Sequence, residues 1–174
     1  MNPAPAVRPA VEGDARAIAE VHVAGWRGGY RGLVDDAVLD ALSVEDRAAG
    51  WARGLAGGSR VLLAGTGGRV EGFACFGAAR DEDLPAGTGE VHALYVLPAA
   101  WGRGTGGALL DAAVAELLTG GAPGVVLWAL EGNARARRFY ERRGWRTDGV
   151  RRVERFDGQE LPAVRHRWAG PATT

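Results

Sequence analysis

The sequence of 174 residues has no lysine, a single cysteine and no long hydrophobic run. All 21 of its basic residues are arginines. One cysteine, Cys75, excludes an internal disulfide, and its place in an apolar run predicts a buried small side chain. No stretch approaches the roughly 20 apolar residues that span a bilayer. The first residues also lack the charged and apolar regions of a signal peptide. The sequence therefore predicts a cytoplasmic protein with no membrane partner.

Residues suited to metal or nucleic-acid binding are also few or scattered. Three histidines and one cysteine lie far apart in the sequence, which predicts no metal site. The formal net charge is zero, but residues 1–130 hold 10 arginines and 15 acidic residues, and residues 131–174 hold 11 arginines and 6 acidic ones. Acidic residues interrupt these arginines and no nucleic-acid motif accompanies them, so we expect no nucleic-acid partner. The basic segment is either a solvated face or a source of attraction for an anionic ligand.

A glycine-rich segment is the most informative part of the chain. Residues 98–110 read PAAWGRGTGGALL, with four glycines in six positions. They lie between a predicted strand ending near Leu97 and an amphipathic stretch reaching Leu118. Amides at the start of a helix have no backbone acceptor, and the helix dipole is positive there. The segment therefore predicts a binding site for a phosphate-bearing ligand.

One interpretation of these glycines is a dinucleotide-binding site. The segment GRGTGG over 102–107 matches the GxGxxG fingerprint, and Glu131 follows at a plausible interval. In a Rossmann unit, however, the glycines directly follow the strand, whereas four residues intervene here. The motif also begins after residue 100, which leaves too little chain for a doubly wound sheet. This alternative is the weaker one.

Two motifs together point to another family. The segment from Glu90 to Pro98, followed by GRGTGGALL, closely resembles the acetyl-CoA motif of the GNAT N-acetyltransferase superfamily. Trp101, Gly104 and Gly106 align with its usual pattern Gln/Arg-x-x-Gly-x-Gly/Ala, so tryptophan replaces the usual Gln or Arg. Residues 133–145, NARARRFYERRGW, resemble the family's later motif Asn…Ala…Phe-Tyr-x-x-x-Gly-Phe. With the opening VRPA, the resemblance spans nearly the whole chain.

The periodicity of the sequence agrees with the fold that this resemblance implies. We expect an α/β fold with a mixed, mostly antiparallel sheet of about six to seven strands, flanked by about four helices, in which two central parallel strands splay apart. We expect residues 5–169 to form one acetyltransferase domain, and 1–4 and 170–174 to be flexible tails. Gly28-Gly29 is expected to end the first helix, and Gly144 to end the helix of the later motif. Alternation along the strand from Glu90 is expected to put Glu90, His92 and Leu94 on one face.

The resemblance implies acetyl-CoA as cosubstrate and assigns its contacts. Leu94, Tyr95 and Val96 would bond to the pantetheine arm and acetyl carbonyl through the strand backbone. The segment from Arg103 to Ala108 would present amides to the pyrophosphate. Asn133 would also touch the cofactor, and Arg142 or Arg143 would reach the 3′-phosphate. The cofactor-binding residues expected are Leu94, Tyr95, Val96, Arg103, Gly104, Thr105, Gly106, Gly107, Ala108, Asn133, Tyr140 and Arg143.

Acetyl transfer to an amine needs a base for the ammonium and an acid for the leaving thiolate. Tyr140 is the expected acid, because a phenol with a pKa of about 10 keeps its proton at neutral pH. Glu90 is the expected base through water, and His92 is the alternative, with an ordinary pKa near 6.5. Asn133 is expected to cap the helix of the later motif.

The expected function is direct transfer of an acetyl group from acetyl-CoA to a primary amine. Trp26, Tyr30 and Glu90 are the expected substrate-binding residues, and aromatic and acidic groups suit a cationic amine. The acceptor is a small-molecule amine or a protein N-terminus, and a homodimer is left open. The alternative from another class is a non-catalytic acyl-CoA-binding or sensor domain with the same glycine site.

Overall fold

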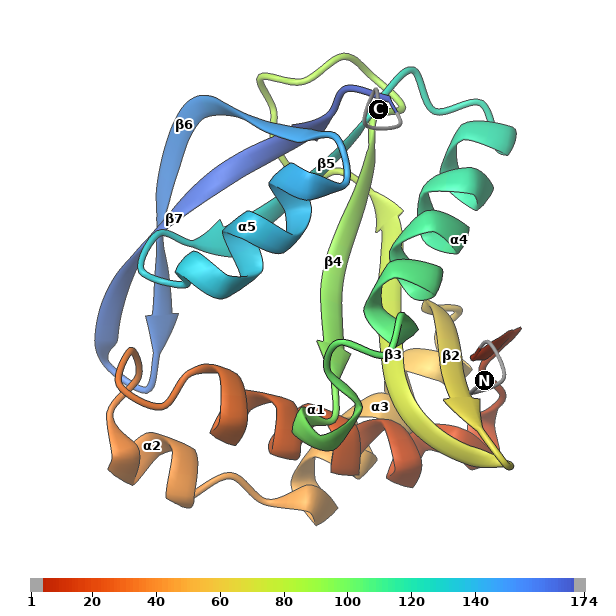
Figure 1. Ribbon diagram of the computed structural model, residues 1–174, viewed down its shortest axis with the longest axis vertical. Helices are drawn as coiled ribbons and strands as arrows, with labels where there is room; N and C mark the ends of the chain where they lie inside the picture. Colours follow the sequence, from red (N-terminus) through yellow and green to blue (C-terminus); the bar gives the residue numbers. More distant parts are fainter. Residues whose placement is uncertain (1–4, 171–174) are drawn as a thin grey trace.

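A seven-stranded sheet with helices on both faces forms the protein (Figure 1). The computed structural model describes residues 5–170, so the tails expected at 1–4 and 170–174 lie outside the described residues except for Gly170. Along the chain the elements are β1 (Ala6–Pro9), α1 (Ala15–Gly29), α2 (Asp36–Asp40), α3 (Val44–Ala56), β2 (Arg60–Thr66), β3 (Arg69–Ala78), β4 (Gly89–Val96), α4 (Thr105–Thr119), β5 (Val125–Leu130), α5 (Ala134–Arg142), β6 (Trp145–Phe156) and β7 (Gln159–Trp168). Short 3-10 turns, η1 (Glu12–Asp14) and η2 (Pro98–Ala100), precede α1 and α4.

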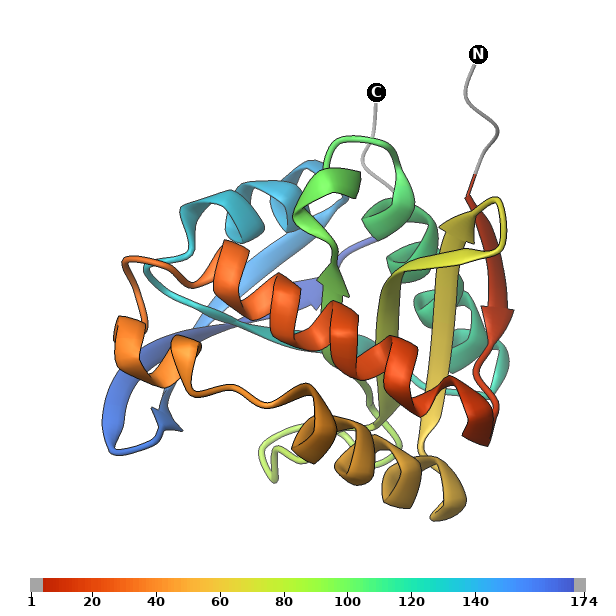
Figure 2. The same cartoon turned by 90° about the horizontal axis from the view of Figure 1, so that it is seen from below.

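The strands lie in the order β1-β2-β3-β4-β5-β7-β6. The pair β4 and β5 is parallel, and all other neighbouring pairs are antiparallel. Helices α1 and α3 pack together on one face, while α4 and α5 cover the other (Figure 2). The fold expected from the sequence is confirmed, with five α-helices among the described residues where about four were expected. No helix of the described residues is long and apolar enough to cross a membrane.

The central strands supply both hydrophobic cores by simple alternation. Leu62 of β2 and Ala74 of β3 are buried under α4, whereas their neighbours Leu63 and Phe73 are buried under α1 and α3. Successive side chains of a strand point to opposite faces, so each strand contributes to both layers. This explains the continuous apolar runs of the sequence, which strands covered on both faces require.

The two parallel strands separate soon after they begin. β4 and β5 pair at only three positions, from Gly89 opposite Val125 to Val91 opposite Leu127. Beyond these positions β5 continues to pair with β7 on its other side, and β4 with β3. The backbone groups of β4 and β5 that face each other beyond Val91 are therefore free of strand partners. The splay expected between the central parallel strands is thus present.

A bulge in β4 changes which side chains face the splay. The register between β3 and β4 shifts by one residue, so that His92 has no partner in β3. After the bulge, Leu94 packs in the core under α4, and Tyr95 packs toward α1. The expectation that Glu90, His92 and Leu94 share one face is therefore wrong for Leu94. Glu90 and His92 stay together, with 3.9 Å between His92 Nε2 and Glu90 Oε2.

Helix α1 ends at Gly28-Gly29, as expected, with Tyr30 as its C-cap. A Cβ at Gly28 would lie 2.5 Å from Pro98 Cγ, and one at Gly25 would lie 3.2 Å from Tyr95 Cβ. The glycines therefore act as close-packing positions, because only a helix face without side chains can lie this near to the end of β4. Gly144 follows α5 in a left-handed conformation (φ 87°), also as expected.

Candidate active site

The turn between β4 and α4 leaves backbone amides free. Gly104, at the N-cap of α4, has φ 89°, a left-handed conformation that favours glycine. Within residues 5–170, no backbone acceptor takes the N–H groups of Thr105, Gly106 or Gly107. Gly104, Gly106 and Gly107 line a groove of about 360 Å³. Free amides at the positive end of a helix make this part of the groove suited to an anion.

Trp101 holds this turn in place, and an arginine side chain stacks on its ring. Its Nε1 donates a hydrogen bond to the Val96 carbonyl at 2.9 Å, so the indole holds the turn against the end of β4. The Arg135 guanidinium stacks on the indole, 3.6 Å from the ring centroid. Both residues line the groove. Tryptophan at this position therefore places a positive charge at the groove through Arg135.

Arg142 and Arg143, at the end of α5, also line the groove. Arg143 forms an ion pair with Asp111 of α4. A Cβ at Gly107 would lie 2.7 Å from Arg143 Nη1, so this guanidinium packs against the glycine turn. Arg143 Nε is buried and has no acceptor among the described residues. An anion in the groove would therefore meet guanidinium groups as well as amides.

A smaller cavity of about 90 Å³ lies in the splay between β4 and β5. All three tyrosines of the chain line it: Tyr30 at the end of α1, Tyr95 in β4 and Tyr140 in α5. The hydroxyls of Tyr30 and Tyr95 are 3.1 Å apart. The Tyr140 hydroxyl makes no hydrogen bond within residues 5–170, and Tyr140 lines both the cavity and the groove.

Burial keeps these phenols neutral. It raises the pKa of Tyr140 far above the ordinary value of 10.0, and nearby Tyr95 adds to the rise while Arg135 opposes it. Burial likewise raises the pKa of Tyr30, which Tyr95 raises further. Tyr140 therefore holds its proton throughout the neutral and mildly alkaline range. Because no described residue accepts that proton, it is available to a group in the cavity.

The side chains of Glu90 and His92 both contact the end of β3 or the β3–β4 loop, residues 79–88. Glu90 is 3% exposed, and its Oε2 accepts a hydrogen bond from the Arg80 amide at 3.2 Å. His92 Nε2 lies 2.9 Å from the Ala78 carbonyl, and its Nδ1 lies 3.3 Å from Arg80 Nη2. A carbonyl only accepts and a guanidinium only donates, so the ring carries its proton on Nε2. Of the two, only His92 lines the cavity.

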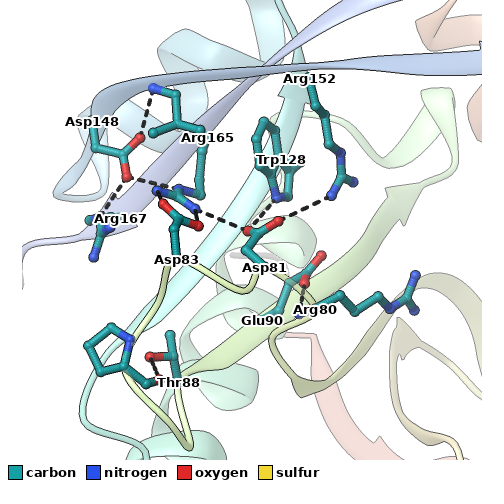
Figure 3. Close-up of polar contacts among 12 residues, drawn as sticks. Arg80, Asp81, Asp83, Thr88, Glu90, Trp128, Asp148, Arg152, Arg165 and Arg167 are labelled. Atoms are coloured by element: carbon teal, nitrogen blue, oxygen red, sulfur yellow. Dashed lines mark hydrogen bonds and ion pairs between the residues drawn. The ribbon is translucent and has the colours of Figure 1, made fainter.

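A polar network fastens the same loop to the far side of the sheet (Figure 3). Arg165 of β7 is 1% exposed and bonds to Asp83 with two hydrogen bonds of 2.6 and 2.7 Å. It also bonds to Asp148 of β6 at 2.8 Å and to Asp81 at 3.3 Å. Asp81 in turn accepts a hydrogen bond from the indole of Trp128, which lines the splay cavity. The network therefore links the loop that holds Glu90 to one wall of the cavity.

The acceptor side predicted around Trp26 and Tyr30 is an aromatic cluster. The Trp26 ring lies 5.2 Å from the Tyr30 ring and 5.0 Å from that of Phe156, both edge-on. Gln159, in the β6–β7 hairpin, accepts a hydrogen bond from the Asp35 amide (2.8 Å) and donates one to the Leu33 carbonyl (3.1 Å). The hairpin is thereby joined to the α1–α2 loop beside Tyr30.

The structure brings most of the predicted site residues together. Those that line the groove or the cavity are Tyr30, His92, Leu94, Tyr95, Val96, Gly104, Gly106, Gly107, Asn133, Tyr140 and Arg143. Asn133 also caps α5 by accepting a hydrogen bond from the Ala136 amide (3.1 Å). Glu90, Trp26, Arg103, Thr105 and Ala108 line neither space; Arg103 is exposed, and the Thr105 side chain is buried.

Arg135 and Trp128 were missed by sequence reasoning. Arg135 lies two residues after the predicted cap Asn133, in an arginine-rich helix where spacing does not single it out. Its stacking on Trp101 joins two motifs that are 34 positions apart in the chain. Trp128 lies in an apolar strand that predicts core packing, and only the splay exposes it to a cavity.

Comparison with known proteins finds the same family throughout. The model of the acetyltransferase (GNAT) family matches residues 28–145. The uncharacterized N-acetyltransferase YuaI of Bacillus subtilis is 35% identical over 129 residues, which are 73% of this chain and 72% of that protein. A solved GCN5-related N-acetyltransferase from Rhodopseudomonas palustris is 26% identical and covers 96% of both chains with a TM-score of 0.77. The structure of yncA from Salmonella typhimurium, solved with its cofactor acetyl-CoA, is 25% identical, covers 99% of this chain and 100% of that one, and has a TM-score of 0.68.

Proposed function

The chain belongs to the GNAT acetyltransferase family, and from that premise we propose that it moves the acetyl group of acetyl-CoA directly to a primary amine, with Tyr140 as general acid. Family membership makes the protein an acyltransferase, and its N-acetyltransferase relatives support N-acetyl transfer. The observation that carries the proposed mechanism is the Tyr140 hydroxyl: neutral, unpaired within the described residues and shared by the groove and the splay cavity.

The groove fits acetyl-CoA in shape and charge. When bound, acetyl-CoA supplies the thioester whose acetyl group the amine attacks. The amides of Thr105, Gly106 and Gly107 would hold its diphosphate, and their lack of a backbone acceptor within residues 5–170 supports this assignment. The stacked Arg135, with Arg142 and Arg143, would balance the remaining phosphate charge.

The free edge of β4 would hold the pantetheine arm. Pairing between β4 and β5 ends at Val91, so backbone groups of β4 beyond it are available to amide groups of a ligand. Leu94, Tyr95 and Val96 line the groove along this edge. The edge leads from the glycine turn to Tyr140, which supports a linear path from the diphosphate to the reacting end.

Tyr140 would protonate the leaving thiolate. Its raised pKa keeps the phenol protonated before the reaction, and the Arg135 charge that opposes this rise would stabilise the phenolate formed afterwards. Glu90 would accept the ammonium proton through water, because its Oε1 accepts no hydrogen bond from a described residue. His92 serves less well as the base, since both of its ring nitrogens contact the β3–β4 loop.

Substituting Tyr140→Phe tests the proposal. We expect kcat to fall by about 10²- to 10⁴-fold, the usual contribution of a positioned acid, while the Kd for acetyl-CoA stays within about twofold. Thiol release from acetyl-CoA over a panel of amines measures turnover, and calorimetry measures cofactor binding. Tyr30→Phe is the matched control, because it removes a hydroxyl from the same cavity and should cost less than about tenfold. In the same assay, Glu90→Gln should lower kcat, because a glutamine side chain cannot accept the ammonium proton.

Two results would contradict the proposed function. If Tyr140→Phe turns over like the wild type, Tyr140 is not the acid. If the wild-type protein binds acetyl-CoA, acetylates no amine and is unaffected by the substitution, the chain is an acyl-CoA sensor.

A further inference from the structure

The splay cavity, in which the amine would meet the acetyl group, is walled almost entirely by neutral side chains. Burial keeps its phenols protonated, because it raises the pKa of all three tyrosines. The imidazole of His92 faces a carbonyl with one ring nitrogen and a guanidinium with the other, which suits the neutral ring. Among the described residues, the one formal charge on the wall is the Arg135 cation. The polar side chains of the wall are those of Tyr30, Tyr95, Tyr140, Trp128, His92, Asn133 and Arg135.

Glu90, the acidic group that the sequence predicts for this site, lies outside the cavity. Its side chain is 3% exposed, and its Oε2 accepts a hydrogen bond from the Arg80 amide at 3.2 Å. Glu90 can take up a proton through water, but it does not touch a group inside the cavity. None of the residues that line the cavity is acidic, within the part of the chain that the structure describes.

Two further carboxylates lie near the cavity, and arginines pair with both. Asp81 accepts a hydrogen bond from Arg165 at 3.3 Å (Figure 3). Glu154 of β6 accepts one from Arg152 at 2.6 Å, and it is only a minor influence on the pKa values of the nearby tyrosines. An ammonium ion in the cavity would therefore find no unpaired carboxylate beside it among residues 5–170.

Such a space favours a neutral amine over an ammonium ion. Removing an ion from water without a counter-ion costs far more free energy than removing a neutral amine. Aromatic rings attract cations, but less strongly than the burial of an unpaired charge opposes them. The Arg135 cation adds repulsion. A neutral amine can donate N–H groups to the phenol oxygens of Tyr30 and Tyr95, and it keeps its lone pair for the acetyl carbon.

We propose that the splay cavity admits its acceptor only as the neutral amine, so that the acceptors of this protein are weakly basic amines. This inference rests on the proposed acetyl transfer and narrows the class of its acceptor. The α-amine of a peptide or amino acid amide and an arylamine belong to the class, whereas a lysine-type amine does not. At pH 7 about one α-amine in ten is neutral, but only about one lysine-type amine in 2,500.

Fluorinated ethylamines test the inference without turnover. Ethylamine and its 2-fluoro, 2,2-difluoro and 2,2,2-trifluoro derivatives differ little in size, but each fluorine makes the amine less basic. Each is titrated by calorimetry into the protein with CoA, between about pH 6.5 and 8.5. We expect the Kd of ethylamine to fall about tenfold per pH unit, with about one proton released per amine bound. The Kd of the trifluoro derivative, which is neutral throughout this range, should stay constant and reports any effect of pH on the protein itself.

Asn133→Asp supplies the carboxylate that the cavity wall lacks. Asn133 lines the cavity and caps α5 through its Oδ1, and aspartate is an equally good cap whose charge the helix N-terminus favours. We expect this variant to bind the ethylammonium ion, so that the Kd of ethylamine at pH 6.5 falls by about tenfold or more and no longer depends on pH. Ala134→Asp is the control, because it adds the same charge at an exposed neighbour that lines neither the cavity nor the groove. It should leave the Kd of ethylamine unchanged.

Three acceptors extend the test to turnover. Glycinamide offers an α-amine, aniline an arylamine and Nα-acetyl-lysinamide a lysine-type amine. At pH 7 we expect kcat/KM for glycinamide or aniline to exceed that for Nα-acetyl-lysinamide by about a hundredfold or more, since the neutral fractions differ by at least that factor. The faster of the first two identifies the kind of weakly basic amine that the protein uses.

The results distinguish failure of this inference from failure of the proposed function. If the wild type acetylates Nα-acetyl-lysinamide as fast as glycinamide and aniline, the neutral-amine cavity is wrong and acetyl transfer stands. If no amine is acetylated but the Kd of ethylamine follows its neutral fraction, acetyl transfer is wrong and the neutral-amine cavity stands. A Kd of ethylamine that does not depend on pH, or absence of binding by all four ethylamines, overturns the inference.

Discussion

His22 is a half-buried histidine on the wall of the aromatic cluster, and its surroundings keep it neutral. Its ring stacks on Tyr95 at 5.2 Å between centroids, and its Nδ1 accepts a hydrogen bond from Trp51 Nε1 at 3.1 Å. Burial, with a smaller contribution from the Arg47 charge, lowers its pKa to about 4. The cluster is therefore built around an uncharged ring, and protonating that ring opposes folding.

The pH dependence of stability follows from this shift. The unfolded chain binds a proton at His22 near pH 6.5, whereas the folded protein does so only near pH 4. Stability is therefore lost as the pH falls from 6.5 to 4, by about 3 kcal/mol at 1.36 kcal/mol per pKa unit. We expect His22→Phe to flatten this part of the profile, measured by urea unfolding at each pH. His166, whose pKa is also lowered by burial, leaves a residual slope.

The control for this prediction is Trp51→Phe. It removes the hydrogen bond to His22 but keeps the titrating ring, so the slope between pH 6.5 and 4 should remain. If the free energy of unfolding of His22→Phe falls between pH 6.5 and 4 as steeply as that of the wild type, other groups cause the pH dependence.

At the scale of the element, the start of α4 combines a binding role with a backbone constraint. Gly104 has φ 89° and no atom within 4 Å of where its Cβ would be, so a side chain there meets strain and not a clash. Gly121, just beyond the other end of α4, has φ 92° and equally open surroundings. The two glycines therefore have the same conformational need, but only Gly104 lines the groove.

This pair gives a controlled test of the glycine turn. We expect Gly104→Ala and Gly121→Ala each to destabilise the protein by about 1–2 kcal/mol, the cost of a left-handed L-residue. Only Gly104→Ala should raise the Kd for acetyl-CoA, by about tenfold, because its methyl group enters the groove and its turn moves the free amides. Thermal unfolding and calorimetry measure the two effects. Equal acetyl-CoA affinity in both variants would contradict the assignment of the diphosphate to this turn.

At the scale of the whole molecule, the sheet consists of two halves that meet at the splay. Strands β1 to β4 form one half, and β5, β7 and β6 form the other, with only three paired positions between β4 and β5. The Arg165 network adds a second link, because Asp81 and Asp83 belong to the β3–β4 loop and Arg165 and Asp148 to the other half (Figure 3). The two halves are therefore joined where β4 begins, and β4 and β5 are unpaired with each other beyond Val91.

Breaking the network should weaken the joint between the halves. We expect Arg165→Met to destabilise the protein by about 3 kcal/mol at neutral pH, because Asp81 and Asp148 then lose a buried cation. Arg167→Met, the same change at an exposed position of the same strand, should cost less than about 1 kcal/mol. Denaturant unfolding measures both, and equal losses would contradict a special role for Arg165.

Low pH should reduce the difference in the free energy of unfolding between wild type and Arg165→Met. The Arg165 hydrogen bond lowers the pKa of Asp83 below 3.8. Burial raises the pKa of Asp148, but hydrogen bonds from Arg167, the Val150 amide and Arg165 outweigh it, so this pKa is also lowered. Stabilisation from these carboxylates is thus present above pH 3.8 and lost as the pH falls through their folded pKa values.

The sequence alone was sufficient for the local features of the site. These features depend on neighbours within a few residues, so a sequence motif is enough to indicate them. They are the glycines at 104, 106 and 107, the helix cap at Asn133 and the tyrosine at 140. Alternation and continuous apolar runs also indicated the mixed sheet, because they reflect burial on each face, whereas the parallel central pair was implied by the resemblance to the family.

Tertiary packing decided the features that depend on distant residues. Gly25 and Gly28 lie against Tyr95 and Pro98, which local periodicity does not show, and one unpaired residue at His92 turns Leu94 away from Glu90. Arg135 stacks on Trp101, and Arg47 on Trp26, because the fold brings separate elements together. A local pattern specifies backbone conformation and burial, whereas the partner of a long charged side chain depends on which elements the fold brings within a few ångströms of it.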